Sequence, residues 1–362
     1  MKSFAVSAFL AAALLACSSG SDPSRFDLDQ PDTTPASSGD ALAGDDSLIS
    51  PDGQPDDVDP TDVATTQDSD SPGPDDAPQP PLDSAPDGER ITVATWNVRR
   101  LFDTVCDSGV CGDNAFESAY SQAQFDFKIS QVVSGIQRLD ADIVLLQEVE
   151  NGAALDALAA ALSDQYDFHV LGETNFDASL DTAVLARGEL IQVTSHRGVR
   201  IPRPLGGTTS FAREFLEVEF SLQGQRIIVF NAHFKSQNDD DPDRRLAEAL
   251  AAADIVAARI AERPDASVVL GGDLNDVPGS AAINAINEVA ALLRAASELG
   301  DGDGTVEFNG QANALDHIYV CTTCPWTFIP GTAAVVRSSG SAALSGSDHA
   351  GLRASIGPRG TP

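Results

Sequence analysis

Two uninterrupted apolar segments constrain the fold of this chain more than any other feature. Residues 141–150 read ADIVLLQEVE, and residues 267–276 read SVVLGGDLND. An apolar run without polar alternation is typical of a strand that is buried on both faces. Strands of this kind need a covering layer on each side, so the sequence predicts a layered domain with its sheets inside.

The other predicted elements fit such layers. Residues 91–98 alternate in the manner of a strand, and two strand patterns flank SLQGQ at 221–225 as a hairpin. Apolar residues recur at helical spacing in 127–139, 152–166 and 244–263. Because strands and helices are mixed without a strict βαβ rhythm, we expect the α+β class.

The first 17 residues have the pattern of an export signal. One Lys precedes an apolar run that is too short to span a bilayer, and small residues follow it. LLAC at 14–17 resembles the bacterial lipobox, which implies cleavage before Cys17 and lipid attachment to it. The alternative is an ordinary signal peptide cleaved near Ala16. Ser18 and Ser19 follow the cysteine, with no Asp directly after it. This pattern resembles that of bacterial lipoproteins that are exported and anchored to the outer membrane.

Residues 17–88 are predicted to form a disordered acidic linker. The first 88 residues hold 18 of the 55 acidic residues and 2 of the 22 basic ones, and they are rich in Pro, Ser, Gly and Thr. A segment of this composition cannot bury enough apolar surface to offset the entropy of ordering. We therefore expect a signal peptide at 1–16, the linker at 17–88 and one folded domain at 89–362.

Four further cysteines lie in the predicted domain, and they are Cys106, Cys111, Cys321 and Cys324. An even count in an exported protein favours disulfides. Of the three possible connectivities we prefer the local pairs, Cys106–Cys111 and Cys321–Cys324. A zinc site built on the C-x₄-C and C-x₂-C spacing is the alternative, and export disfavours it.

Polar residues that could bind a metal ion or take part in catalysis stand at the ends of six predicted strands. They are Asn97, Glu148, Asn231, His233, Asp273, Asn275, Asp316, Asp348 and His349. One such residue alone is more often a turn cap or a structural hydrogen-bonding group. Asp273 and Asn275 lie two apart, so strand alternation predicts that both side chains point to one side. Together the six ends predict one site with hard oxygen ligands and two imidazoles.

The motifs WNV, LLQEVE, NAHFKS, GGDLND, LDHIYV and SDH, in this order, resemble the endonuclease/exonuclease/phosphatase superfamily, and the resemblance covers about residues 90–357. It implies a four-layer α/β/β/α sandwich, the DNase I-like fold, with the site at one end of two packed sheets. It also implies phosphoester hydrolysis with a divalent metal ion. Mg²⁺ is the expected ion, with Mn²⁺ and Ca²⁺ as alternatives.

The resemblance implies a metal site made of Asn97 and Glu148. Mg²⁺ takes oxygen ligands and keeps several waters, so one or two carboxylates suffice to hold it. Asp348 is expected to complete the metal shell or to serve a second metal position. The metal ion would polarise a phosphoryl oxygen.

The same resemblance implies the catalytic roles. His349 is the candidate general base, and Asp316 is the carboxylate that orients its imidazole. His233 is expected across the phosphate, donating to the leaving oxygen or to a phosphoryl oxygen. Asp273 and Asn275 are expected to contact the phosphate or the attacking water.

Substrate choice rests on fewer residues. NAHFKS followed by an Arg-bearing helix most resembles secreted bacterial nucleases, so nucleic acid is the expected substrate. Arg187, Arg213 and Lys235 are the candidate substrate-binding residues. A sphingomyelinase-type phospholipid phosphodiesterase is one alternative, and a surface binding module without turnover is another. We expect a monomer with no protein partner, attached to the membrane only through Cys17.

Overall fold

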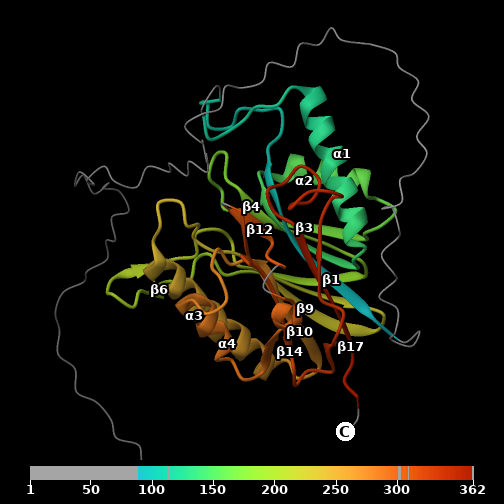
Figure 1. Cartoon of the computed structure of the whole chain (residues 1–362), viewed down its shortest axis with the longest axis vertical. Helices are drawn as coiled ribbons and strands as arrows, with labels where there is room; N and C mark the ends of the chain where they lie inside the picture. The colour runs from blue at the N-terminus through green and yellow to red at the C-terminus, as the bar shows by residue number, and fades with distance from the viewer. Residues whose placement is uncertain (1–88, 112–114, 301–302, 309, 361–362) are drawn as a thin grey trace, which may run out of the picture. The chain divides into compact units, whose positions relative to one another are not determined.

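Two β-sheets pack face to face in the computed structural model, and helices cover the outer face of each sheet (Figure 1). The structure describes residues 89–111, 115–300, 303–308 and 310–360. The predicted signal peptide, the predicted lipidation site Cys17 and the predicted linker lie outside these residues. No helix of the described ranges is long and apolar enough to cross a membrane.

The first sheet has the strand order β15-β17-β1-β2-β4-β3, and β16 pairs with β17. Its strands are β1 (Ile91–Leu101), β2 (Ile143–Val149), β3 (Phe168–Gly172), β4 (Asp181–Ala186), β15 (Trp326–Phe328), β16 (Ala334–Val336) and β17 (Gly351–Pro358). β1 and β2 are parallel, with Asn97 opposite Gln147. The polar ends of these two strands therefore emerge at the same edge of the sheet.

The second sheet has the order β11-β14-β10-β9-β8-β5. Its strands are β5 (Glu189–Ser195), β8 (Leu216–Leu222), β9 (Gln225–His233), β10 (Ala266–Asp273), β11 (Leu292–Arg294) and β14 (Asp316–Cys321). β8 and β9 form the hairpin predicted around SLQGQ. Two short hairpins pair outside both sheets, and they are β6 (Ile201–Pro202) with β7 (Thr208–Thr209), and β12 (Val306–Phe308) with β13 (Gln311–Asn313).

The helices form the outer layers. They are α1 (Gln122–Leu139), α2 (Gly152–Ala161), α3 (Pro242–Glu262), α4 (Ala281–Asn287) and the 3₁₀ helix η1 (Ala295–Glu298). α1 begins earlier than its apolar spacing predicts, because Ser121 and Gln124 form a capping box. α2 ends earlier than predicted, at Ala161.

Three apolar clusters define the order of the layers. Leu145 of the first sheet and Val229 and Ile318 of the second lie in one cluster between the sheets. A second cluster joins α1 and α2 to the outer face of the first sheet, and a third joins α3 and α4 to the second sheet. The expected four-layer α/β/β/α sandwich is confirmed.

Both local cysteine pairs are disulfides. Cys106 and Cys111 are bonded with their Cα atoms 5.9 Å apart, and Cys321 and Cys324 are bonded with a separation of 5.6 Å. The predicted connectivity is confirmed. The zinc alternative is wrong for these four residues, because zinc binds free thiolates and each sulfur here is bonded to its partner.

Gly272 allows the backbones of β10 and β9 to approach each other closely near the ends of these strands. We predict that this position tolerates no side chain. Its φ is +145°, and a Cβ atom would lie 1.9 Å from the carbonyl oxygen of Ala232. Gly272→Ala should lower the free energy of unfolding by about 3 kcal/mol or more in denaturant titrations, through backbone strain and overpacking. Gly279→Ala is the control, since Gly279 has φ +93° with open space around its Cβ position. Equal losses in the two variants would contradict the close-approach argument.

Candidate active site

The strand pairing brings polar residues from distant parts of the sequence to one end of both sheets. In the second sheet, Asp273 on β10 lies opposite His233 on β9 and opposite Asp316 on β14. In the first sheet, Asn97 and Glu148 stand near the ends of the parallel strands β1 and β2. The face-to-face packing of the sheets then places the two groups together.

Asn97 connects the two sheets. Its Nδ2 donates to Glu148 Oε1 at 2.9 Å and to Asp273 Oδ2 at 3.2 Å. Its Oδ1 accepts from the backbone nitrogen of Arg99 at 2.9 Å, which fixes the orientation of the amide. The exposed fractions of Asn97, Glu148 and Asp273 are 1%, 7% and 2%. A buried amide that bridges two carboxylates gives the site one fixed centre.

Glu148 reaches this centre through an irregularity in β2. Its φ is +67°, and the pairing register of β2 with β4 shifts between Gln147 and Val149. Such bulges redirect a side chain at the edge of a sheet. Glu148 Oε2 also accepts from the backbone nitrogen of Arg100 at 2.9 Å. Both carboxylate oxygens are therefore held in place.

His349 and Asp316 form a buried pair. His349 Nδ1 lies 2.8 Å from Asp316 Oδ2, and its Nε2 lies 3.9 Å from Asp273 Oδ2. The indole of Trp96 donates to the backbone oxygen of His349 at 3.2 Å, which fixes the chain just before β17. Burial lowers the pKa of His349, but the nearby carboxylates of Asp316 and Asp273 outweigh it and raise the pKa to about 10.

His233 also lies near Asp273 Oδ2, but it has the opposite charge preference. Its Nε2 is 3.7 Å from Asp273 Oδ2, and its Nδ1 is buried without a hydrogen-bond partner among the described residues. Burial holds the pKa of His233 well below its usual range, and the charges of Arg213 and His349 lower it further. One imidazole of the site therefore favours the cation and the other favours the neutral form.

Asn275 belongs to the site, but the reason given by strand alternation is wrong. β10 ends at Asp273, and Asn275 has φ +52°, so the chain has already turned out of the strand. Its Nδ2 donates to the backbone oxygen of Phe234 at 3.2 Å, and its backbone nitrogen donates to Asp273 Oδ1 at 2.9 Å. A left-handed turn, which asparagine tolerates, brings it back toward the end of β9.

The donor set of this centre fits a divalent ion with a preference for oxygen ligands. Asp273, Asp316 and His349 offer ligand atoms within 4.8 Å of one another. Asp316 Oδ1 is buried and has no hydrogen-bond partner in the described part of the chain. The carboxylate of Glu148 is held beside this group through Asn97. Carboxylate oxygens are ligands that Mg²⁺ prefers, and waters complete its shell. Asn97 was expected to be a ligand, but it presents its amide nitrogen to Glu148 and Asp273 while its oxygen accepts from Arg99, so it holds the carboxylates in place.

Asp348 lies outside this donor set. Its side chain is 48% exposed, and Oδ2 lies 3.5 Å from Arg99 Nε. The residue stands directly before His349, at the surface of the loop that leads into β17. The expectation that it completes the metal shell is therefore not supported by its position, because its carboxylate faces an exposed guanidinium.

The predicted substrate-binding cations separate into two groups. Arg213 lies close enough to His233 to lower its pKa, and its Nη1 donates to the backbone oxygen of Phe234 at 3.4 Å. Lys235 neighbours Arg213, and its Nζ donates to the backbone oxygens of the turn that follows. These two cations lie beside the site.

Arg187 does not approach the site. Its Nη1 is paired with Asp142 Oδ1 at 2.7 Å, and its Nε donates to the backbone oxygen of Gln165. Asp142 directly precedes β2, whereas Glu148 stands near the other end of that strand. The expectation for Arg187 is wrong, because the strand that precedes it runs antiparallel to β2 and ends at the opposite edge of the sheet.

Two buried residues near the site make hydrogen bonds between separate elements that the sequence patterns did not reveal. Lys128 of α1 is 8% exposed, and its Nζ donates to the backbone oxygen of Val98 at 2.8 Å. Gln147 Nε2 donates to Asn231 Oδ1 at 2.7 Å across the two sheets. A lysine on the apolar face of a predicted helix is the signal that would have drawn attention to Lys128.

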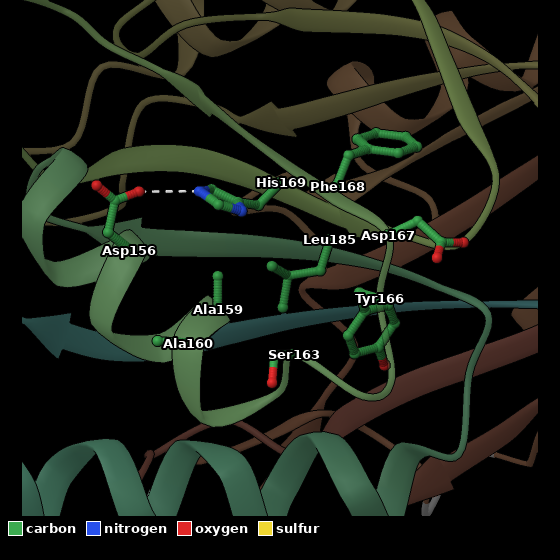
Figure 2. Close-up of a pocket in the computed structure, with 9 residues that line it drawn as sticks. All are labelled: Asp156, Ala159, Ala160, Ser163, Tyr166, Asp167, Phe168, His169 and Leu185. Atoms are coloured by element: carbon green, nitrogen blue, oxygen red, sulfur yellow. Dashed lines mark hydrogen bonds and ion pairs between the residues drawn. The ribbon is translucent and has the colours of Figure 1, made fainter.

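A separate cavity of about 420 Å³ lies between α2 and β3, and none of the predicted site residues lines it. Figure 2 shows that His169 points toward Asp156 there. The distance between His169 Nε2 and Asp156 Oδ1 is 2.9 Å. These side chains are 38% and 74% exposed. Because this pair is exposed whereas the pair of His349 and Asp316 is buried, His169 serves as a comparison for His349.

Comparisons with known proteins give the family and the fold of the domain. The sequence model of the Endonuclease/Exonuclease/phosphatase family matches residues 94–349. No curated protein matches the sequence significantly.

Three solved structures illustrate the likeness of fold. TDP2 of D. rerio, complexed with single-strand DNA product, is 17% identical, with 74% of this chain and 99% of that chain covered and a TM-score of 0.52. The human Nocturnin catalytic domain with bound sulfate anion is 14% identical, with coverage of 75% and 94% and a TM-score of 0.53. A Bacteroides thetaiotaomicron endonuclease/exonuclease/phosphatase family protein is 16% identical, with coverage of 74% and 95% and a TM-score of 0.53. Because the family model spans most of the described domain, the chain belongs to the endonuclease/exonuclease/phosphatase family.

Proposed function

We propose that this protein is a divalent-metal-dependent phosphodiesterase that hydrolyses nucleic acid with low sequence specificity. Membership of the family gives hydrolysis of phosphodiester bonds as the class of reaction. The observation that supports the proposal most is the buried network in which Asn97 contacts both Glu148 and Asp273, with two histidines near Asp273 Oδ2.

His349 is proposed to act as the general base. Asp316 accepts from Nδ1 and so leaves Nε2 free to take a proton from an attacking water. A group with a pKa of about 10 keeps its proton at neutral pH, because two carboxylates stabilise the imidazolium. A divalent ion held by Glu148 and the neighbouring carboxylates would offset that negative field and polarise a phosphoryl oxygen.

His233 is proposed to act as a neutral donor. Its low pKa means that the imidazole is neutral and carries one N–H at neutral pH. This N–H can form a hydrogen bond to the leaving oxygen or to a phosphoryl oxygen. Asn275 is proposed to add an amide donor on the same side, since its Nδ2 lies within reach of the end of β9. Both groups stabilise negative charge without changing their own charge.

Basic residues beside His233 support an anionic polymer as the substrate. Burial lowers the pKa of Lys235, and the nearby charges of Arg213 and Arg244 lower it further, although the whole chain carries a formal charge of −33. Local positive charge against an acidic background is what a phosphate backbone would require. The D. rerio TDP2 structure contains a single-strand DNA product, which is consistent with a nucleic-acid substrate here.

Arg213→Gln is predicted to weaken substrate binding. Removal of one charged contact to phosphate should raise KM for DNA about tenfold and reduce the dependence of KM on salt, with kcat little changed. Steady-state kinetics at several salt concentrations would measure both effects. Arg187→Gln is the matched control, because Arg187 is held by Asp142 at the far end of β2. A similar rise in KM for both variants would rule out a specific role for Arg213.

One assay tests the reaction and the substrate together. The purified protein is incubated with Mg²⁺ or with EDTA, in parallel against plasmid DNA, RNA, sphingomyelin and a chromogenic phosphodiester. The proposal expects Mg²⁺-dependent cleavage of nucleic acid. Release of phosphocholine without DNA cleavage would favour the phospholipid alternative, and no hydrolysis of any substrate would favour a binding module.

We also propose that the protein is exported and anchored to the outer membrane through lipid on Cys17. The support is the LLAC sequence at 14–17 and the serines that follow it. Several acyl chains hold a protein stably at a membrane, at roughly 0.8 kcal/mol per buried CH₂ group. A Cys17→Ser variant that remained in the membrane fraction after alkaline washing would contradict the anchor.

A further inference from the structure

An exposed phenylalanine and an arginine contact each other at the surface of the domain. Phe176 lies in the loop between β3 and β4, and it is 51% exposed. The guanidinium carbon of Arg197, which follows β5, lies over the phenylalanine ring at 5.0 Å from the ring centroid. A cation in this position is attracted by the face of the ring. Arg197 therefore holds the ring in place, while much of Phe176 stays open to solvent.

The loop that carries Phe176 is fixed at the end of the first sheet where the active site lies. Asp181 Oδ1 accepts from the hydroxyl of Thr174 at 2.8 Å, and Asp181 Oδ2 accepts from the hydroxyl of Ser179 at 2.9 Å. In the pairing of β4 with β2, Asp181 lies opposite the residue that directly follows Glu148. Both sides of the loop are therefore tied to a strand position next to the active site.

Arg197 approaches the loop from the second sheet. Its Nη1 donates at 2.9 Å to the backbone oxygen of the residue that directly precedes Arg213. Burial lowers the pKa of Arg197, and the charge of Arg213 lowers it further, against the raising effects of two carboxylates, of which that of Asp181 is the larger. Arg213 acts in the same direction on His233 of the active site. The contact of Arg197 with Phe176 is therefore one step further from the catalytic centre than Arg213.

We propose that Phe176 and Arg197 form a stacking platform for one base of a single-stranded nucleic acid whose phosphates contact Arg213 and Lys235. Every base has a π face, so an exposed aromatic ring binds bases with little sequence preference, and arginine adds a cation–π contribution. The bases of a duplex are stacked on their neighbours, and a base must leave that stack to reach a protein ring. The platform therefore favours single strands over duplexes. The proposal rests on the proposed function, of which it requires the nucleic-acid ligand but not the hydrolysis.

Fluorescence anisotropy tests the platform, with a labelled single-stranded oligonucleotide and the duplex of the same sequence, in EDTA to prevent cleavage. Phe176→Ala should weaken binding of the single strand at least about fivefold, the low end for loss of one stacked base, and binding of the duplex less than about twofold. Phe176→Trp keeps an aromatic ring and should retain the affinity for the single strand. Leu190→Ala is the control, because Leu190 is 40% exposed and pairs with Phe220 beside the β8–β9 turn, at the end of the second sheet remote from His233.

Four results would overturn the proposal. They are the absence of single-strand binding by the unaltered protein, full affinity in Phe176→Ala, an equal loss for the single strand and the duplex, and an equal loss in Leu190→Ala. The reaction is tested separately, with Mg²⁺ and a chromogenic phosphodiester that carries no base. A protein that binds the single strand through Phe176 and hydrolyses no phosphodiester would keep the platform and lose the proposed catalytic function. Hydrolysis of nucleic acid with unaltered single-strand binding in Phe176→Ala would do the reverse.

Discussion

Replacement of His349 with Ala is expected to lower phosphodiester hydrolysis at least about 100-fold, the low end for loss of a positioned proton-transfer group. The imidazole is buried, its Nδ1 is paired with Asp316, and its Nε2 lies 3.9 Å from Asp273 Oδ2, a combination that His233 does not share because its Nδ1 has no hydrogen-bond partner among the described residues. The measurement is kcat/KM with a chromogenic phosphodiester at saturating Mg²⁺. His169→Ala is the matched control, because that histidine also faces an aspartate but lies on the separate cavity shown in Figure 2.

Asp316→Asn separates the imidazole from the group that orients it. The carboxylate of Asp316 raises the pKa of His349, so its removal should lower that pKa. If neutral His349 is the active form, the acid limb of the pH–rate profile moves to lower pH while the maximal rate falls. An unchanged profile in Asp316→Asn, or equal activity of the His349→Ala variant and the unaltered protein, would refute the assignment.

The layers and the polar strand ends could be predicted from sequence because both depend on local patterns. Uninterrupted apolar runs such as 143–146 mark buried strands, and a carboxylate or histidine directly after such a run stands at a sheet edge. The order of six motifs along the chain then indicated which edges meet. The register that sets Asp273 beside His233 and Asp316 is a tertiary property, and only the structure gives it.

The sequence-based expectations that were wrong also concerned properties that depend on tertiary structure. Arg187 follows β4 and Glu148 stands near the end of β2, but antiparallel pairing places the two residues at opposite ends of the sheet, and a local sequence pattern does not give the strand direction. Asn275 leaves the strand through a positive φ that alternation cannot anticipate. Lys128 and Gln147 act from buried positions, and their partners lie on other elements far along the chain.

Asp273→Asn is expected to lower kcat/KM at least about 100-fold, because Oδ2 of this residue faces Asn97 and both histidines. The amide keeps the shape of the carboxylate and loses its charge. Less negative charge also remains to hold a divalent ion, so the Mg²⁺ concentration for half-maximal rate should rise. Activity measured against Mg²⁺ concentration separates these two effects.

The same substitution is expected to make the protein more stable above neutral pH. Burial and then the charge of Asp316 raise the pKa of Asp273 to about 7, against the opposing effect of His349. A folded-state pKa above the unfolded value means that stability falls as pH rises from about 4 to about 7 and then stays low. Asn carries no such cost, so the variant should gain over the unaltered protein at pH 8 and gain little at pH 4 in denaturant titrations. Lower stability of Asp273→Asn at pH 8 would show that the ionised carboxylate is held favourably, and that the site is not a place where stability is given up for catalysis.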